Sequence, residues 1–371
     1  MPNDKFCVRP FVHSLVDTRG DYKPCCRATV DTGYNINQHS IKEWWQGSYL
    51  TDLRQRMIDG KDTPECWRCQ RQEEQGVESF RQQSNRQWPL REEDLPTGLP
   101  LDWEIQITNL CNLRCLMCNP ASSSQVLAED KKIFGIADSN RDYEWNPDSE
   151  REVRKMFETG TSFVIRGGEP FMVPYIKPII ARLQKKKKFL FNTNATCFDD
   201  EWTEILSRHD VKMSISIDGF NQLNHYIRYP SDWSDIVSNL HRMRQISGVN
   251  MFLNTCVQNL NVLHLDDLLV WAVQGQGLYV NLDVLTKPEF LEPSCLPHEL
   301  AQEAVARLED VKKIVDVRMI RGLDGVIGAV KNNSTDRWQE FQDYINAKDA
   351  HRGLSIIDYI PEMEPYFAKT T

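Results

Sequence analysis

Eleven cysteines constrain this 371-residue chain more than any other feature of its sequence. Eight of them fall in two sets, whereas Cys197, Cys256 and Cys295 stand alone. A chain of this length can bury a large core, so it needs no disulfide to hold its fold together. In a reducing compartment, clustered cysteines indicate metal binding or catalysis. The fold must therefore gather each set around a ligand.

The composition of the chain changes twice along its length. Residues 1–95 show little regular periodicity but carry five cysteines, and Arg91 to Pro100 is predicted to be a linker. Residues 101–290 alternate short apolar runs with longer amphipathic segments, which predicts strand–helix units and a parallel sheet. Residues 291–371 are predicted to form a helical C-terminal region. Three regions are therefore expected.

Six strands and the helices between them are predicted from these patterns. The strands are expected at residues 103–108, 162–166, 188–194, 211–218, 249–257 and 278–285. The helices are expected at residues 149–158, 173–186, 200–208, 232–247, 262–275, 298–314 and 334–348. Six units are too few for an eightfold barrel, so the predicted fold is an α/β partial (β/α)6 barrel. The long insertion at 119–148 is predicted to be a loop that covers the substrate.

Polar side chains share one face of several predicted strands, because successive side chains alternate between the two faces. Ser214, Ser216 and Asp218 lie opposite Ile215 and Ile217. The same alternation pairs Glu104 with Gln106, Asn192 with Asn194, Asn254 with Cys256, and Asn281 with Asp283. A core filled only for stability would favour apolar side chains, and α/β barrels carry their chemistry at the carboxyl ends of the strands. The pattern therefore predicts a substrate cavity.

Three cysteines of the second set follow the first predicted strand. Cys111, Cys115 and Cys118 have the spacing Cys-x3-Cys-x2-Cys. Three thiolates on one loop can hold a four-iron cluster and leave one iron open for a substrate or cofactor. The alternative is a partial zinc site completed by a distant histidine, but zinc sites usually show paired Cys-x2-Cys units. The spacing favours the iron–sulfur cluster.

This loop, on the first strand of a six-unit barrel, resembles that of the radical S-adenosylmethionine (SAM) superfamily, over about residues 101–290. The sequence Gly-Gly-Glu-Pro after the second strand is similar to the family motif that binds the amino group of SAM. Glycines allow close backbone approach, and a carboxylate suits an ammonium group. The usual glycine-rich motif after the fifth strand is not evident. The resemblance implies that SAM is bound by Gly167, Gly168, Glu169, Asn192, Asn194, Ser216, Asp218, Asn254 and Met117.

The first cysteine set is similar to the auxiliary-cluster modules called SPASM or twitch domains. Cys7 and Cys25 have the spacing Cys-x12-Gly-x4-Cys, and a later Cys-x2-Cys supplies Cys66 and Cys69. Such modules normally follow the barrel, so this arrangement is permuted. The resemblance implies that these four thiolates bind an auxiliary 4Fe–4S cluster, with Cys26 able to exchange with Cys25. A structural zinc knuckle is the alternative, since Cys-x2-Cys serves both metals.

These resemblances imply an enzyme that reductively cleaves SAM at a 4Fe–4S cluster and abstracts hydrogen from a substrate with the 5′-deoxyadenosyl radical. The auxiliary module favours a peptide or protein substrate that is oxidised, cross-linked or epimerised, with flavodoxin or ferredoxin as reductant. Dehydrogenation of a small alcohol or amino sugar is one alternative, and an iron–sulfur scaffold without SAM turnover is another. Cys256 is the candidate catalytic hydrogen donor, because it shares a face with Asn254. Burial as a small apolar side chain is the competing interpretation.

Charge and hydropathy narrow the partners and the location. A net charge of −9 disfavours nucleic acid, because binding its backbone requires an excess of positive charge. No stretch approaches the roughly 18 apolar residues of a membrane span, and the first residues lack the apolar region of a signal peptide. A cytoplasmic protein without a membrane partner is therefore expected. No pattern in the sequence indicates an oligomeric state.

Overall fold

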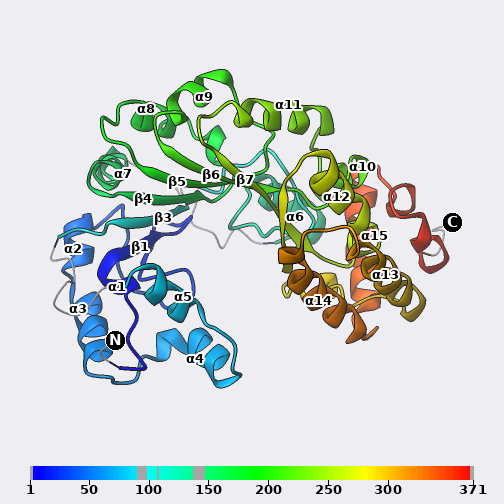
Figure 1. Ribbon diagram of the computed structural model, residues 1–371, viewed down its shortest axis with the longest axis horizontal. Coiled ribbons are helices and arrows are strands. Elements are labelled where there is room, and N and C mark those ends of the chain that lie inside the picture. The colour runs from blue at the N-terminus through cyan, green and yellow to red at the C-terminus, as the bar shows by residue number, and fades with distance from the viewer. Residues whose placement is uncertain (1–2, 90–97, 107, 137–146, 368–371) are drawn as a thin grey trace. The chain divides into compact units, whose positions relative to one another are not determined.

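The computed structural model describes residues 3–89, 98–106, 108–136 and 147–367 (Figure 1). The chain divides into two compact units, each built from segments that are distant in sequence. The first contains Met1–Leu110, Ser139–Phe191 and Ile205–Val211. The second contains Cys111–Asp138, Asn192–Glu204 and Lys212–Thr371.

The N-terminal region contributes strands to the sheet of the first unit. Its strands are β1 (His13–Val16), β2 (Tyr22–Lys23), β3 (Asp102–Gln106), β4 (Ser162–Arg166) and β5 (Lys188–Thr193). Their order is β2-β1-β3-β4-β5. Strand β1 pairs antiparallel with β2 and parallel with β3, and β3, β4 and β5 are parallel. The cysteine-rich region is therefore joined edge to edge to the predicted barrel strands.

Short helices surround this sheet. They are α1 (Arg9–Val12), α2 (Ile41–Trp45), α3 (Ser48–Ile58), η1 (Pro64–Cys66), α4 (Trp67–Glu74), α5 (Phe80–Gln87), α7 (Pro147–Thr159), η3 (Pro170–Met172) and α8 (Ile176–Ala181). Helix α2 begins at a capping box, in which Ser40 and Glu43 satisfy each other's backbone N–H groups. The core is aromatic, with Phe157 stacked on Phe163 and Phe163 on Phe189. Trp44 is fully buried, and its Nε1 donates to Ser14 Oγ at 2.7 Å.

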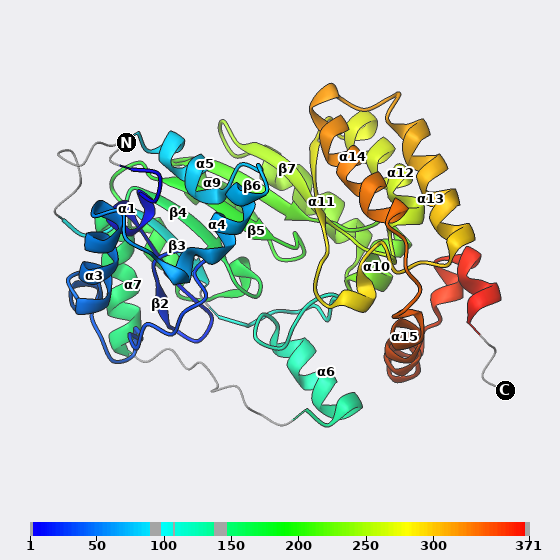
Figure 2. The same ribbon diagram turned by 90° about the horizontal axis from the view of Figure 1, so that it is seen from below.

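Three parallel strands form the sheet of the second unit. They are β6 (Asp210–Ser216, in this unit from Lys212), β7 (Asn250–Val257) and β8 (Tyr279–Val284), in the order β6-β7-β8. The helical elements are α6 (Ser124–Phe134), α9 (Asp200–Leu206), α10 (Gln222–Ile227), α11 (Trp233–Arg244), η4 (Val262–His264), α12 (Leu265–Val270), η5 (Trp271–Gly275), η6 (Glu289–Leu291), α13 (His298–Val311), α14 (Val317–Lys331), α15 (Trp338–Arg352), η7 (Ile356–Asp358) and η8 (Pro361–Tyr366). Helices α13 and α14 lie side by side (Figures 1 and 2), and α14 also packs on β8.

The six predicted strands correspond to β3–β8, and the predicted α/β fold with parallel strands is confirmed. Several local predictions are wrong. Residues 124–134 of the predicted loop form α6, because the Ser123 side chain caps this helix and Val126 and Leu127 are buried. The predicted helix 173–186 shortens to α8, whereas the helix α14 was not predicted at all. Most of the predicted linker and residues 137–146 of the predicted loop lie outside the described residues.

Candidate active site and auxiliary metal centre

Cys111, Cys115 and Cys118 lie together in one buried cluster of the second unit. Cys111 and Cys115 are buried, and Met117 and Cys118 pack against them. The Leu113 N–H donates to Cys111 Sγ at 3.5 Å, and Arg228 Nη1 donates to Cys115 Sγ at 4.0 Å. Such N–H···S contacts are typical of cluster ligands, whose properties depend on hydrogen bonds to the sulfurs.

These thiols are poor candidates for free thiolates. Burial, and then the charges of Cys115 and Cys111, raise the pKa of Cys118 to about 12. Burial also raises the pKa of Cys115, and the positive charge of Arg228 opposes this increase. A metal centre binds thiolates and supplies the positive charge that makes several ionised neighbours tolerable. The donor set therefore fits an iron–sulfur cluster.

Distant parts of the second unit hold the backbone of this cysteine loop. The N–H groups of Arg114 and Leu116 donate to Tyr229 O at 2.6 Å and Ile227 O at 2.9 Å. From α15, Arg352 Nη2 donates to Arg114 O at 2.6 Å and Tyr344 Oη donates to Leu116 O at 2.7 Å. The two carbonyls flank Cys115. No sequence pattern indicates this support, because its acceptors are backbone atoms.

A buried charge network fixes α15 in that position. Arg352 donates through Nε and Nη2 to Glu129 of α6, at 2.8 Å and 2.7 Å. Lys348 Nζ donates to Glu129 Oε2 at 2.8 Å and also contacts Asp130. The side chains of Lys348 and Arg352 are each 1% exposed. Buried charges persist only when they are paired, so this network ties α15 to α6.

The predicted Gly-Gly-Glu motif lies at the end of β4 in the first unit. Gly168 N donates to Thr108 O at 2.7 Å, and Glu169 N donates to Leu110 O at 2.8 Å. A Cβ atom at Gly168 would lie 2.0 Å from Leu110 O, which only glycine avoids. Gly167 has a φ of 132°, also favourable only for glycine. The motif thus packs directly against the residues that lead into Cys111.

Other predicted SAM contacts make bonds within the protein. Glu169 is buried, and its Oε1 accepts from Phe171 N at 3.2 Å. Asn194 Nδ2 donates to Asn112 Oδ1 at 3.1 Å and lies 3.9 Å from Cys111 Sγ. These bonds orient the cysteine loop and its neighbours. Their role toward SAM stays a prediction, as does that of Asn192, which is half-buried on β5.

Both carboxylate oxygens of Asp218 contact other residues of the chain. It is fully buried, and its Oδ1 accepts from Cys256 N at 2.8 Å. Its Oδ2 lies 2.7 Å from Arg228 Nε, so the two form a buried ion pair. Burial raises the pKa of Asp218, and the charge of Arg228 opposes this shift. The carboxylate therefore keeps Arg228 beside Cys115.

The polar row predicted from strand alternation is present across β6, β7 and β8. Ser216 pairs in register with Asn254, and Asn254 pairs with Asn281. The Asn281 Nδ2 atom donates to Asn254 Oδ1 at 2.7 Å. All three residues are half-buried. They form a row of neutral hydrogen-bonding groups near the carboxyl ends of the strands.

Cys256 lies two residues beyond Asn254 on β7, in register with Asp283. It is half-buried, and burial followed by the charge of Asp218 raises its pKa to about 12. Cys295, by contrast, is buried, and Cys197 is half-buried with its Sγ 3.6 Å from Thr196 Oγ1. Cys256 thus remains a protonated thiol at neutral pH, and its catalytic role stays a prediction.

In the first unit, Cys7, Cys25, Cys66 and Cys69 line one pocket. Cys7 precedes α1, Cys25 follows β2, and η1 and α4 bring the last two. Burial, and then the charges of Cys25 and Cys66, raise the pKa of Cys7. Four thiols from three segments therefore converge, as the ligands of one centre must.

Cys26 is not among the residues that line this pocket. Burial, and then the charge of Glu104, raise its pKa to about 11, and Arg166 opposes the shift. Glu104 and Arg166 form an ion pair on β3 and β4. Cys25 thus lines the pocket with the other three cysteines, and its role as the ligand in place of Cys26 stays a prediction.

The four thiols around this pocket are a donor set that suits an iron–sulfur cluster, and thiolates also bind zinc.

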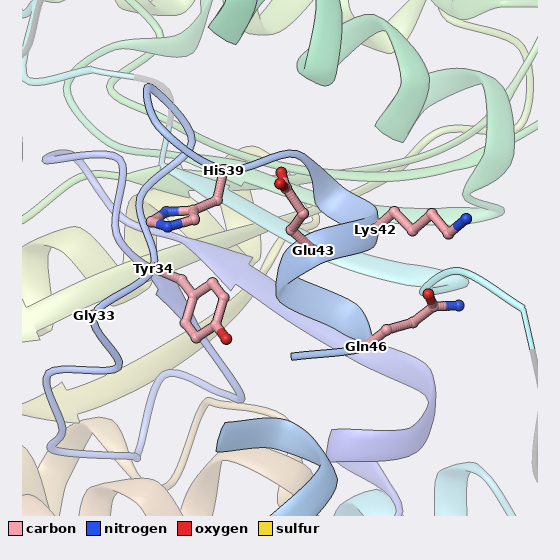
Figure 3. A pocket seen from close by; sticks show the side chains of 6 residues that line it. All are labelled: Gly33, Tyr34, His39, Lys42, Glu43 and Gln46. Atoms are coloured by element: carbon pink, nitrogen blue, oxygen red, sulfur yellow. The ribbon is translucent and has the colours of Figure 1, made fainter. Parts of the chain in front are cut away.

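A surface hollow of about 620 Å³ lies beside α2 (Figure 3). Tyr34 and His39 lie on one side of it with ring centroids 4.9 Å apart. Two of its polar groups already serve the local fold, since Glu43 caps α2 and His39 Nδ1 accepts from Asn35 N. The hollow contains none of the predicted site residues.

Two family models match the chain. Residues 105–271 match the radical SAM superfamily, and residues 7–70 match SPASM, an iron–sulfur cluster-binding domain. The chain therefore carries a radical SAM domain preceded by a SPASM domain. Its cofactors are SAM with the radical SAM cluster and an auxiliary iron–sulfur cluster, as predicted.

Individual relatives are more distant. The "Uncharacterized protein MJ0907" of Methanocaldococcus jannaschii is 24% identical over 194 residues, which are 50% of this chain and 62% of that protein. The solved structure "Native anSMEcpe with bound AdoMet" has a TM-score of 0.42 and 17% identity, over 60% of this chain and 62% of that one. SuiB of Streptococcus suis bound to S-adenosylmethionine has a TM-score of 0.41 and 15% identity, over 75% and 60%. The chain thus spans about three fifths of the length of each.

None of the described helices is long and apolar enough to cross a membrane.

Proposed function

We propose that this chain is a radical SAM enzyme that modifies a peptide or protein, with the four-cysteine pocket holding the auxiliary cluster that assists the reaction. The observation that carries the proposal is the presence of two separate cysteine sites, one with three thiols and one with four. Three thiols leave a cluster iron open for SAM, whereas four close the coordination of the second cluster. The second site is therefore suited to electron transfer.

Residues of the second unit hold the first cluster. Cys111, Cys115 and Cys118 are its proposed ligands, and Arg228 and the Leu113 N–H contact the sulfurs. When bound, the cluster and SAM together supply the 5′-deoxyadenosyl radical that removes hydrogen from an unactivated carbon.

The predicted SAM contacts bind and orient that cofactor. Glu169 offers a carboxylate for the ammonium group, and the glycine pair before it provides backbone that can approach closely. Ser216 and Asn254 offer neutral donors and acceptors in one row for the polar part of SAM. Met117 provides a thioether beside the cysteines, suited to packing on a flat ring.

A neutral polar lining supports a peptide substrate. Asn254 and Asn281 are half-buried, and the hydrogen bond between them uses one amide donor and one acceptor. Their remaining amide groups match the donors and acceptors of a peptide backbone. The nearby cation, Arg228, is already paired with Asp218. A phosphorylated substrate would need free positive charge, so the lining supports an uncharged polar chain over a nucleotide.

The fate of the substrate radical decides the product. In an oxidation or cross-link, one electron and one proton leave the substrate radical, and the four-cysteine pocket is the proposed destination of the electron. In an epimerisation, the Cys256 S–H bond breaks and a C–H bond forms. The resulting thiyl radical then needs one electron and one proton, supplied by a flavodoxin- or ferredoxin-type reductant. The two routes differ in their net redox change.

The test is anaerobic reconstitution followed by a turnover assay with two probe sets. With dithionite and SAM, we expect 5′-deoxyadenosine, and we expect unstructured peptides to accelerate its formation. Small alcohols and amino sugars serve as the matched second set. Acceleration by the small molecules alone would contradict the peptide proposal.

Mass spectrometry of the peptide in deuterium oxide separates the two routes. Loss of two hydrogens indicates oxidation, and gain of one deuteron without a redox change indicates epimerisation. In the second case the Cys256→Ala variant should still form 5′-deoxyadenosine but incorporate no deuterium. Retained incorporation in that variant would exclude Cys256 as the donor.

A further inference from the structure

The four-cysteine pocket is lined by one buried cation, Arg9. Its side chain is 9% exposed, and it lines the pocket together with the four cysteines. Of the other two arginines in the lining, Arg27 is exposed and Arg81 is held by Glu73 and by the carbonyls of Asp4 and Phe6. Arg9 is therefore the cation least screened by water from a group bound there.

A chain of hydrogen bonds orients the Arg9 guanidinium. Its Nη2 lies 2.7 Å from His13 Nε2, and His13 Nδ1 lies 2.7 Å from Asp102 Oδ2. Because arginine can only donate, His13 Nε2 must accept, and the proton of the imidazole lies on Nδ1. Burial and the charge of Arg9 lower the pKa of His13, which agrees with a neutral ring. The ring of Phe80 covers the guanidinium at 4.7 Å from the ring centroid.

One hydrogen-bond donor of the Arg9 side chain has no acceptor among the described residues. The Nε atom of Arg9 is buried and has no hydrogen-bond partner among them. A buried charged donor without an acceptor is costly, so such a group is expected to meet a ligand. The orphan donor and the thiols thus share one pocket.

We infer that Arg9 is a positioning residue that donates its Nε–H to the auxiliary cluster and raises the reduction potential of that cluster. A cluster with four thiolate ligands is anionic, and reduction adds one more negative charge. A fixed cation and an N–H···S bond therefore stabilise the reduced form more than the oxidised form. The inference rests on the auxiliary cluster of the proposed function, and it makes the pocket a better electron acceptor.

Asp102 gives the inference a second, opposite test. Its Oδ2 lies 3.9 Å from Arg9 Nη2, so its negative charge opposes that of Arg9. Asp102 begins β3 and pairs in register with His13 of β1. An asparagine there keeps an acceptor for His13 Nδ1–H but removes the charge. Arg9→Gln should therefore lower the potential, whereas Asp102→Asn should raise it.

The experiment is an anaerobic redox titration of the full chain, followed by electron paramagnetic resonance. The auxiliary signal is the one that persists when Cys111, Cys115 and Cys118 are all changed to alanine. In Arg9→Gln, the ratio of reduced to oxidised auxiliary cluster at a fixed potential should fall about tenfold, equivalent to about 59 mV for one electron. Asp102→Asn should give a smaller rise. The matched control, Arg68→Gln, removes an exposed charge between Cys66 and Cys69 and should change little.

Each outcome decides the inference. An unchanged potential in Arg9→Gln with full iron content overturns it, as does a shift of the same sign in Asp102→Asn. If Arg9→Gln loses the cluster, Arg9→Lys keeps the charge and should retain both iron and most of the potential. Loss of the cluster there too would make Arg9 merely structural and overturn the inference. Zinc or no metal in the wild-type pocket would instead remove the auxiliary cluster of the proposed function.

Discussion

The two cysteine sites are built in opposite ways. At 111–118 the three thiols come from one short loop, and the support for that loop comes from residues more than one hundred positions away, such as Arg228 and Arg352. In the pocket of the first unit, four thiols come from three segments of the first seventy residues. Three thiols leave one iron of a four-iron cluster open, whereas four can close its coordination. This difference agrees with the proposal that the three-cysteine site binds SAM and the four-cysteine pocket transfers electrons.

The largest effect should come from removing either ligand set. Changing Cys111, Cys115 and Cys118 to alanine should halve the iron from about eight to about four per chain and abolish formation of 5′-deoxyadenosine. Cys25→Ala should remove the auxiliary cluster but leave SAM cleavage. Iron analysis and product detection check both results.

Cys26→Ala is the matched control for this comparison. Cys26 is not among the residues that line the four-cysteine pocket, so the variant should keep both clusters. Equal iron loss in Cys25→Ala and Cys26→Ala would contradict the separation of these neighbours. Loss of SAM cleavage in Cys25→Ala would show that the two sites do not act separately.

Gly168→Ala should disturb the approach to the three-cysteine loop. The added Cβ would overlap Leu110 O, so the backbone before Cys111 must move. We expect a loss of about 3 kcal/mol or more in unfolding free energy, together with weaker SAM binding. Denaturant unfolding and calorimetry measure these two effects. Gly325→Ala, in open space on α14, should instead stabilise the chain by about 0.5–1 kcal/mol.

Much of the fold could be predicted because strand alternation is a local signal. The row from Ser216 to Asn281 lies where the pattern placed it. Helix α14 was missed because Gly322, Gly325 and Gly328 weaken its helical signal. It forms because Leu323 and Val326 are buried on one face. Its stability therefore comes from packing rather than from propensity.

The structure of the N-terminal region was also hard to predict from local sequence patterns. Its helices are short, and its core depends on contacts between segments, such as Trp44 with Ser14. The Ser40 and Glu43 capping box was a readable start signal for α2. The support of the cysteine loop had no readable signal, since Arg352 meets a backbone carbonyl 238 positions away. The sequence indicated which cysteines lie together in each site, but not the contacts that hold them.

Arg352→Met tests the distant support of the local ligand set. It leaves Glu129 buried with Lys348 and frees the carbonyl of Arg114. Breaking a buried ion pair on one side costs about 3–5 kcal/mol, so stability and iron at the three-cysteine loop should both fall. Auxiliary iron should persist. Arg337→Met removes an exposed ion pair before the same helix and should cost at most about 1 kcal/mol.

The smallest effect should appear in the pH dependence of stability. Burial alone would raise the pKa of Glu129, but Arg352 and Lys348 lower it from 4.5 to about 2. Arg114, 3.8 Å away, adds a third positive charge facing this carboxylate. Because its pKa is lower in the folded chain, the unfolded chain binds the proton first as the pH falls. The stabilisation is therefore complete above about pH 4.5 and is lost toward pH 2.

Denaturant unfolding of the metal-free chain measures this loss. Between about pH 4.5 and pH 3 the network should account for a loss of about 2 kcal/mol. Glu129→Gln should remove that part of the slope, although the variant is less stable throughout. The matched variant Glu340→Gln changes an exposed carboxylate on α15 and should keep the slope. An unchanged slope in Glu129→Gln would mean that the network does not hold α15 to α6, and that the local ligand set depends on other contacts.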